Sequence, residues 1–190
     1  MEFVEERIAT AGDAGRVSFY DPISKEKVRK VDMGEIFLTA LTKSSERPFL
    51  AGGNNNGDVY IVNSSGSKDL TVALKPHNKL VRQVAFARDD TKLLTASDDA
   101  TVQVIDIASE KVVQSYQGHK LAVSSVEPHQ LDQNTFFSTS FDKSIKVWDL
   151  RTQAAVGGAV TGGALWDCRS VGKHVLAGGE SGLLIVYSVE

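Results

Sequence analysis

Apolar and polar residues alternate in short runs along most of this chain. In residues 17–20, 102–105 and 145–148, a valine, isoleucine or phenylalanine occupies every second position. A period of two is typical of a β-strand, because successive side chains of a strand point to opposite faces of its sheet. No run of ten or more residues has the spacing of an amphipathic helix. The pattern therefore predicts an all-β protein built from short strands.

The same segment recurs five times along the chain. Each copy ends on a short polar residue, and these residues are Asp21, Asn63, Asp106, Asp149 and Ser188. Successive copies are therefore 42, 43, 43 and 39 residues apart. A second landmark keeps the same period, since His77, His119 and Thr161 lie 42 and 42 residues apart. Two landmarks with one period indicate a repeat architecture.

Each repeat predicts four short antiparallel strands. The third repeat places them at 81–87, 92–96, 102–106 and 112–116, and the fourth places them at 123–127, 135–139, 145–149 and 154–159. Asn, Asp and Gly cluster between the second and third strands, where these residue types favour tight turns. A four-stranded sheet of ~40 residues cannot bury both of its faces alone, so the repeats must pack face to face, as in a β-propeller.

Residues 1–190 are thus expected to form one propeller region, with units at about 1–32, 33–76, 77–118, 119–160 and 161–190. The first and last units supply three strands each, which makes about four and a half four-stranded blades. A seven-bladed ring needs roughly 280–315 residues. Three arrangements fit this count: a fragment of a seven-bladed propeller, a closed five-bladed ring, or an open arc that self-associates through its blade edges. We expect the fragment or the open arc.

Composition narrows the function. Apolar residues make up 42% of the chain and charged residues 24%, as in ordinary globular proteins. The net charge of −3 gives no basis for bulk binding of nucleic acid or anionic membranes. No apolar stretch approaches the length of a membrane span, and the N-terminus lacks a signal-peptide pattern. With Cys168 as the single cysteine, we expect a cytoplasmic or nuclear protein.

The fourth repeat carries a family signature. Gly118-His119 is followed, after 28 intervening residues, by Trp148-Asp149. This spacing resembles the WD-repeat family of β-propellers. The resemblance implies a buried hydrogen-bond network that ties the blade together, formed by His119, Ser140 (or Ser138), Asp142 and Trp148. The third repeat departs from the pattern, since Ile105 stands in place of the tryptophan. Another Trp-Asp pair, at 166–167, falls in the first strand of the fifth unit and is not the repeat's motif.

His119, Ser140 and Asp142 are also the components of a hydrolase triad. The structural role is the stronger interpretation, because a buried imidazole and a buried indole both need hydrogen-bond partners. The glycine clusters do not form a phosphate-binding loop, residues 54–65 do not fit a calcium loop, and the histidines are not at metal-ligand spacing. We therefore expect no catalytic residue, no metal site and no cofactor.

A binding scaffold remains as the expected function. Propellers collect recognition residues on the face where the loops before the first strands and after the second strands converge. The residues expected there are Asn55, Asn78, Leu80, Asp98, Lys120, Ala122, Phe141 and Glu180. Phe141 stands next to a turn, so it is either an exposed binding hot spot or packs over the neighbouring blade.

Over essentially all 190 residues, the order of features is similar to that of the C-terminal part of the WD-repeat subunit of superkiller complexes. The similar segments are IATAGDAGRVSFYD, KLLTASDDATVQVIDIASEKVVQSYQGH, FFSTSFDKSIKVWDL, ALWDCRSV and LLIVYSVE. This resemblance implies a non-catalytic adaptor that holds a helicase and a helical-repeat scaffold for exosome-linked mRNA decay, with a further role in transcription elongation.

Other functions also fit the sequence. The alternatives are a WD-repeat adaptor of another assembly, such as a ubiquitin-ligase substrate receptor, and a purely structural half-propeller. An RNA-binding propeller is a third alternative, which the net acidity disfavours.

Overall fold

Five antiparallel sheets, which we call blades 1 to 5 in chain order, make up the computed structural model, which describes residues 8–10, 15–21, 23–32, 36–63 and 72–188. Blade 1 consists of β1 (Ile8–Thr10), β2 (Arg16–Tyr20) and β3 (Lys27–Asp32). Blade 2 consists of β4 (Leu38–Lys43), β5 (Phe49–Asn54), β6 (Val59–Asn63) and β7 (Val72–Leu74). Blade 3 consists of β8 (Val81–Phe86), β9 (Lys92–Ser97), β10 (Thr101–Asp106) and β11 (Lys111–Gln117).

Blades 4 and 5 complete the described fold. Blade 4 consists of β12 (Val123–Pro128), β13 (Thr135–Ser140), β14 (Ser144–Asp149) and β15 (Ala155–Val160). Blade 5 consists of β16 (Leu165–Val171), β17 (His174–Gly179) and β18 (Leu184–Ser188). Consecutive strands are neighbours in every sheet, so the all-β propeller prediction is confirmed, and every strand end predicted for the third and fourth repeats is correct to within one residue. The described residues contain no helix, and so none that could cross a membrane.

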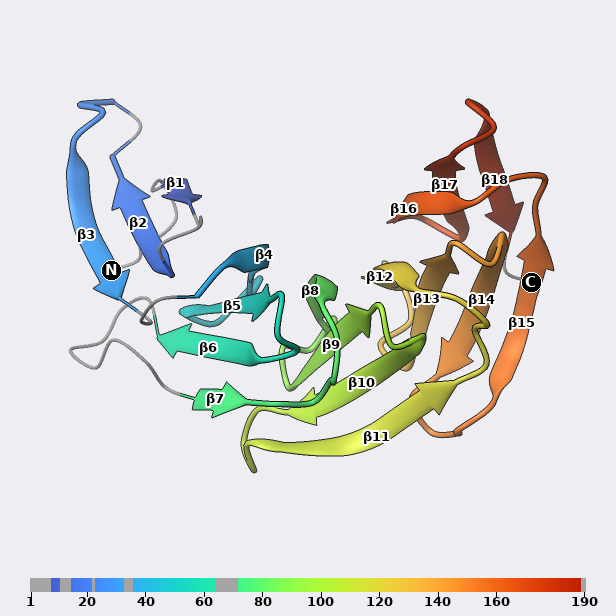
Figure 1. The fold of residues 1–190 in the computed structure, drawn as a ribbon, viewed down its shortest axis with the longest axis horizontal. Coiled ribbons are helices and arrows are strands. Elements are labelled where there is room, and N and C mark those ends of the chain that lie inside the picture. The colour runs from blue at the N-terminus through green and yellow to red at the C-terminus, as the bar shows by residue number, and fades with distance from the viewer. Residues whose placement is uncertain (1–7, 11–14, 22, 33–35, 64–71, 189–190) are drawn as a thin grey trace.

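The blades fan out along an open arc (Figure 1). The strands β4, β8, β12 and β16 lie along the inside of the arc, whereas β3, β7, β11 and β15 lie along its outside (Figure 1). Blades 1 and 5 stand at opposite ends, so the five sheets do not close a ring. Of the three arrangements that fit the repeat count, the closed five-bladed ring is therefore wrong.

In each of the five blades, a residue with a left-handed backbone conformation lies in the turn just before β2, β6, β10, β14 or β18. One residue of each turn has a positive φ, and these residues are Gly15 (60°), Gly57 (91°), Ala100 (69°), Lys143 (70°) and Gly182 (69°). Glycine adopts this left-handed conformation without the steric cost that a Cβ brings. In the two turns without glycine an aspartate closes the turn: Asp99 Oδ1 accepts the Thr101 N–H at 3.0 Å, and Asp142 Oδ1 accepts the Ser144 N–H at 3.0 Å.

The hydrophobic core is divided into four clusters, one between each pair of neighbouring blades. The cluster between blades 3 and 4 holds Trp148, whose ring centroid lies 5.3 Å from that of Tyr116, and Phe136, at 5.0 Å from Tyr116. Both faces of a middle blade are therefore buried, each against a different neighbour. At the end of the arc, blade 5 buries only one face: on β18, Leu184 and Val186 are 69% and 57% exposed.

Candidate functional site

A buried polar network crosses blade 4. His119 Nδ1 lies 3.0 Å from Asp142 Oδ2, and His119 Nε2 lies 2.7 Å from Ser138 Oγ. The Trp148 indole N–H donates to the same Ser138 Oγ at 2.8 Å. The four groups come from four elements. His119 lies in the loop before β12, Ser138 in β13, Asp142 in the turn after β13, and Trp148 in β14. Every polar atom of the network therefore has a partner, as burial requires.

The serine of this network is Ser138, which corrects the expectation that Ser140 fills that role. Ser140 is also buried in β13, but its hydroxyl donates to the Leu121 carbonyl at 3.2 Å and accepts the Asp142 N–H at 3.0 Å. Serines two residues apart point to the same face of a strand, so both satisfy the sequence pattern. Ser138 lies deeper along the strand, where the indole of Trp148 also reaches.

Gly118 is required by this packing. Its φ is +153°, and a Cβ at this position would lie 3.2 Å from the Trp148 ring. Glycine accepts this backbone conformation and leaves room for the indole. The Gly-His pair of the repeat signature thus has a steric reason as well as a polar one.

Blade 3 contains an equivalent network that the sequence reasoning missed. His77 Nδ1 lies 2.9 Å from Asp99 Oδ2, and His77 Nε2 lies 2.8 Å from Thr95 Oγ1. Thr95 and Asp99 each stand 43 residues before Ser138 and Asp142, so the repeat period alone could have found them. Only the indole contact is lacking, because Ile105 replaces the tryptophan.

These networks do not form a catalytic centre. His119 and Ser138 are buried, and Ser138 Oγ is already engaged by the Trp148 N–H, so no substrate carbonyl can reach the hydroxyl. Burial raises the pKa of the Cys168 thiol to about 12, which keeps this cysteine protonated and unreactive. Among the described residues, no group of three or more His, Cys, Asp or Glu side chains could hold a metal ion.

Acid should destabilise the protein in two stages. Burial lowers the pKa of His119 despite the nearby Asp142 carboxylate, so the folded state resists a proton that the unfolded state accepts below pH ~6.5. Burial acts to raise the pKa of Asp142, but hydrogen bonds from Ser144 and the Lys120 N–H outweigh it and lower this pKa to about 2. Hydrogen bonds from His77 and Thr101 likewise outweigh burial and hold the pKa of Asp99 at about 2.

The sign of the effect follows from these directions. The His119 contribution falls as the pH drops below ~6.5, and the contributions of the two aspartates are present above pH ~4 and fall as the pH drops toward 2. Urea unfolding at pH 7.5, 5.5, 4 and 2.5 should show a midpoint that decreases in both intervals. The Asp142→Asn variant should lose less stability than the wild type between pH 4 and 2.5. A midpoint that is constant from pH 7.5 to 2.5 would contradict this assignment.

A second feature is a shared loop face. In four blades, the N–H of the residue that follows the second strand donates to the carbonyl of the loop before the first strand: Asn55 to Phe37 (3.3 Å), Asp98 to Leu80 (3.0 Å), Phe141 to Ala122 (3.1 Å) and Glu180 to Ala164 (2.8 Å). We call the face that carries these loops the upper face. All eight residues predicted for partner binding belong to these loops and turns.

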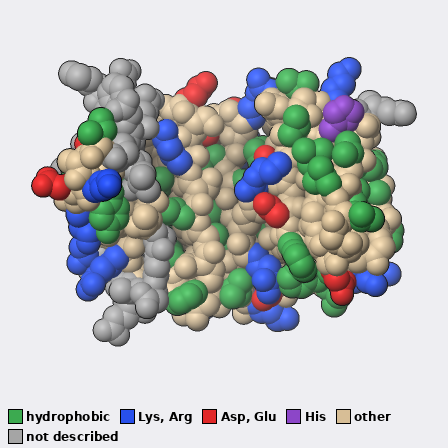
Figure 2. Space-filling view, turned by 90° about the horizontal axis from the view of Figure 1, so that it is seen from above, with side chains coloured by type: hydrophobic (Ala, Val, Ile, Leu, Met, Phe, Trp, Pro, Cys, Tyr) green, Lys and Arg blue, Asp and Glu red, His purple; other side chains and the backbone are tan. Residues whose placement is uncertain are grey.

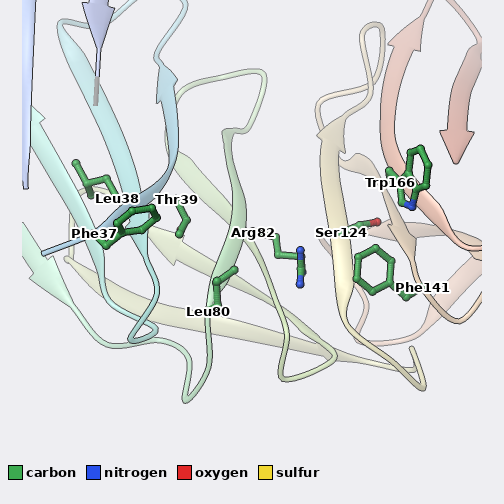
Figure 3. Close-up of a pocket in the computed structure, with 8 residues that line it drawn as sticks. All are labelled: Phe37, Leu38, Thr39, Leu80, Arg82, Ser124, Phe141 and Trp166. Carbon is green, nitrogen blue, oxygen red and sulfur yellow. The ribbon is translucent and has the colours of Figure 1, made fainter. Parts of the chain in front are cut away.

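A pocket of about 590 Å³ opens on the upper face, at the inner side of the arc (Figure 3). Four blades contribute to its wall, which consists of Phe37, Leu38, Thr39, Leu80, Arg82, Ser124, Phe141 and Trp166. Phe37 and Trp166 are 52% and 60% exposed. Large exposed aromatic side chains around a concavity are typical of binding surfaces.

Arg82 joins blades 3 and 4 in this pocket. Its guanidinium pairs with both oxygens of Asp98, with Nη2 at 3.1 Å from Oδ2, and lies over the Phe141 ring at 4.7 Å from the centroid. Figure 3 shows the Arg82 side chain directed toward Phe141. Phe141 thus contacts a side chain of the neighbouring blade, as one of its two interpretations expected, and it also lines the pocket, while its role as a binding hot spot stays a prediction.

The structure brings together only some of the predicted partner-binding residues. Leu80 and Phe141 line the pocket, and Asp98 joins it through Arg82. The remaining five lie on the same loops without lining it: Asn55, Asn78, Lys120, Ala122 and Glu180. In the space-filling view, hydrophobic side chains lie next to Lys and Arg side chains along the lower edge of the molecule as drawn (Figure 2).

Several pocket residues had no signal in the sequence pattern. Thr39, Arg82, Ser124 and Trp166 each occupy the second position of an inner strand, at spacings of 43, 42 and 42 residues. Equivalent positions carry four different residue types, so no motif marks them. The repeat register alone could have placed them on one circle.

Together, the five antiparallel blades, the His–Asp networks and the Trp-Asp strand define a WD-repeat β-propeller. A solved structure described as the mitotic checkpoint complex contains a chain of the same fold, with a TM-score of 0.89 at 21% sequence identity over 97% of this chain and 58% of that chain. The chain belongs to the family described as "Nucleolar protein 10-like, N-terminal domain", whose model matches residues 2–189.

Curated relatives are WD-repeat proteins as well. The WD repeat-containing protein 55 homolog of Drosophila persimilis is 34% identical over 122 residues, which is 63% of this chain and 24% of that protein. The nuclear distribution protein PAC1 of Candida dubliniensis is 29% identical over 142 residues, which is 67% of this chain and 28% of that protein. The chain thus spans about a quarter of the length of these relatives.

Proposed function

We propose that this chain is a non-catalytic, protein-binding scaffold of a nucleolar assembly, and that the upper-face pocket is a docking site for a partner protein. The observation that carries the location is the match of residues 2–189 to a family named for a nucleolar protein. Ribosomal subunits are assembled in nucleoli, so we infer an assembly that acts in ribosome biogenesis. Under this proposal the protein acts in the nucleus rather than in the cytoplasm.

The scaffold role is supported by how the chain uses its polar and apolar groups. His119, Ser138 and Asp142 have the residue types of a catalytic triad, but their polar atoms all bond to one another or to neighbours within the buried network. The exposed aromatic groups, by contrast, gather around the pocket, where Phe37 and Trp166 offer large apolar areas. Aromatic residues and arginine dominate the binding energy of protein interfaces.

The superkiller role stays a prediction that rests on the similar sequence segments. It would require the chain to bind a helicase and a helical-repeat scaffold. The relatives reported above are a WD repeat-containing protein 55 homolog and a nuclear distribution protein, which give this role no support.

The proposal predicts a nucleolar location and a pocket-dependent set of partners. A tagged chain expressed in eukaryotic cells should coincide with a nucleolar marker and recover nucleolar proteins after crosslinking. The double variant Phe141→Ala, Trp166→Ala should recover these proteins at least about tenfold less, because truncated hot-spot aromatics cost about 2 kcal/mol or more of binding. Its unfolding midpoint should change little compared with that of a core variant, since Trp166 is exposed and Phe141 is only half-buried.

The matched control is Leu131→Ala. Leu131 is 58% exposed and lies between β12 and β13, on the loop set opposite the upper face. This variant should recover partners as the wild type does. A purely cytoplasmic chain that recovers superkiller subunits would replace the nucleolar proposal with the superkiller role, and equal recovery by the double variant would exclude the pocket as the docking site.

A further inference from the structure

The pocket has apolar walls and very few free polar groups. Thr39 Oγ1 already donates to the Val81 carbonyl at 2.5 Å, and Ser124 Oγ donates to the Thr139 carbonyl at 3.0 Å. The Thr39 hydroxyl thus links blades 2 and 3, and the Ser124 hydroxyl is engaged within blade 4. A ligand that enters the pocket meets mainly the rings of Phe37, Phe141 and Trp166.

Arg82 is the exception. A guanidinium has five N–H donors in a planar fork. Asp98 accepts two of them, from Nε and Nη2, and the described residues accept none of the other three. The bidentate pair and the Phe141 ring fix the plane of the group, so the remaining donors are pre-organised for a carboxylate or a carbonyl.

The charges around this arginine favour an anionic ligand. Lys79 and Lys120 are exposed on the two loops that flank Leu80 and Ala122, and neither ammonium group is paired with a described residue. On the other side of the pocket, Glu180 and Asp167 are exposed acidic residues, and Asp167 is paired with Arg169. Asp98 pairs with Arg82, and the Asp99 and Asp142 carboxylates are engaged in the His77 and His119 networks. Lys79 and Lys120 are therefore the exposed, unpaired charges on this side of the pocket.

We propose that the pocket recognises an acidic segment of a partner protein, in which an aromatic side chain enters between Phe37, Phe141 and Trp166 while a neighbouring carboxylate binds the free N–H groups of Arg82. This inference rests on the proposed scaffold function and adds the chemistry of the partner. Lys79 and Lys120 steer the same segment toward the pocket. The carboxylate adds a charge-assisted hydrogen bond, which is roughly twice as strong as a neutral one.

A protein segment fits this surface better than a nucleic acid. Polynucleotide binding needs several cations that neutralise successive phosphates. Here Asp98 already balances Arg82, which leaves only two unpaired lysines beside the pocket. The pocket also offers no free side-chain hydroxyl or amide for reading base edges, because its Thr39 and Ser124 hydroxyls are engaged.

The test measures fluorescence anisotropy with the 190-residue chain and two labelled peptides. The first has the central sequence Gly-Glu-Phe-Glu-Gly, and the second has glutamine in place of both glutamates. The acidic peptide should bind about tenfold more tightly than the glutamine peptide, and this preference should shrink as salt is raised. Arg82→Gln should abolish the preference, and Lys120→Gln should reduce it without any change in the unfolding midpoint. Trp166→Ala should weaken both peptides equally.

Lys173→Gln is the matched control, because Lys173 is an exposed lysine in the turn between β16 and β17, away from the upper face. It should bind like the wild type. Equal affinity for the two peptides would overturn the inference, and so would tighter binding of a twelve-nucleotide uridine RNA that displaces the acidic peptide. If neither peptide binds while the chain still recovers nucleolar proteins through Phe141 and Trp166, this inference fails and the proposed function stands. If the acidic peptide binds but no nucleolar protein is recovered, the proposed function fails and this inference stands.

Discussion

Replacing Trp148 by alanine should lower the free energy of unfolding by about 3–5 kcal/mol, the usual cost of truncating a large buried aromatic residue. Trp148 is 1% exposed and packs between blades 3 and 4 against Tyr116 and Phe136. The variant also removes the indole N–H from Ser138. Equilibrium urea unfolding, followed by circular dichroism, measures the change.

Two companions separate packing from hydrogen bonding in that experiment. Trp148→Phe keeps most of the ring volume and loses only the indole donor, so it should cost less than the alanine variant. Trp166→Ala removes the chain's other tryptophan, which is 60% exposed, and should change stability by less than about 0.5 kcal/mol. A loss below about 1 kcal/mol for Trp148→Ala would show that the interface between blades 3 and 4 does not depend on this ring.

Asp142→Ala should cost about 1–3 kcal/mol, because it leaves the buried His119 and Ser144 side chains without this acceptor. The carboxylate accepts the Lys120 N–H at 2.8 Å and the Ser144 hydroxyl at 2.6 Å, and it lies 3.0 Å from His119 Nδ1. The variant should also lose the contribution of Asp142 to the destabilisation between pH 4 and 2.5, while the contribution of Asp99 remains, since both carboxyl groups have a lowered pKa.

The equivalent substitution in blade 3 tests whether the two networks contribute equally to the free energy of unfolding. Asp99→Ala should have an effect of similar size, because Asp99 contacts His77 and Thr101 in the same arrangement. Asp142→Asn retains an acceptor oxygen and should cost less than Asp142→Ala. If Asp142→Ala unfolds at the wild-type urea concentration, the network contributes nothing to stability and its role must be reconsidered.

Most of the fold could be predicted from the sequence, because it depends on local patterns. Period-two alternation and turn residues placed the strands of blades 3 and 4 to within one residue. The number of blades that meet in space, by contrast, depends on the angle between neighbouring sheets. That angle is set by side-chain packing in the clusters between blades, so the repeat count alone could not separate a closed ring from an arc.

The candidate site was predictable only where one blade supplies it. His119, Asp142 and Trp148 come from one repeat with a recognisable spacing. Ser138 and Ser140 share a strand face, so the alternation could not choose between them. The pocket gathers side chains from four blades, so no single repeat contains its pattern. From the sequence alone, Trp166 has no role beyond a Trp-Asp pair outside the motif position, whereas the arrangement of the inner strands brings it to the pocket wall.

The pocket wall includes one residue from the same position of each of four inner strands, and this arrangement has an evolutionary consequence. Thr39, Arg82, Ser124 and Trp166 occupy matching positions, yet none of them belongs to the hydrophobic clusters that hold the blades together. A single codon change at one of them replaces one sector of the wall and leaves these hydrophobic clusters intact, while a change at Thr39 also removes its hydrogen bond to the Val81 carbonyl. Duplicated copies of such a gene can therefore diverge in ligand preference stepwise, through intermediates that all still fold.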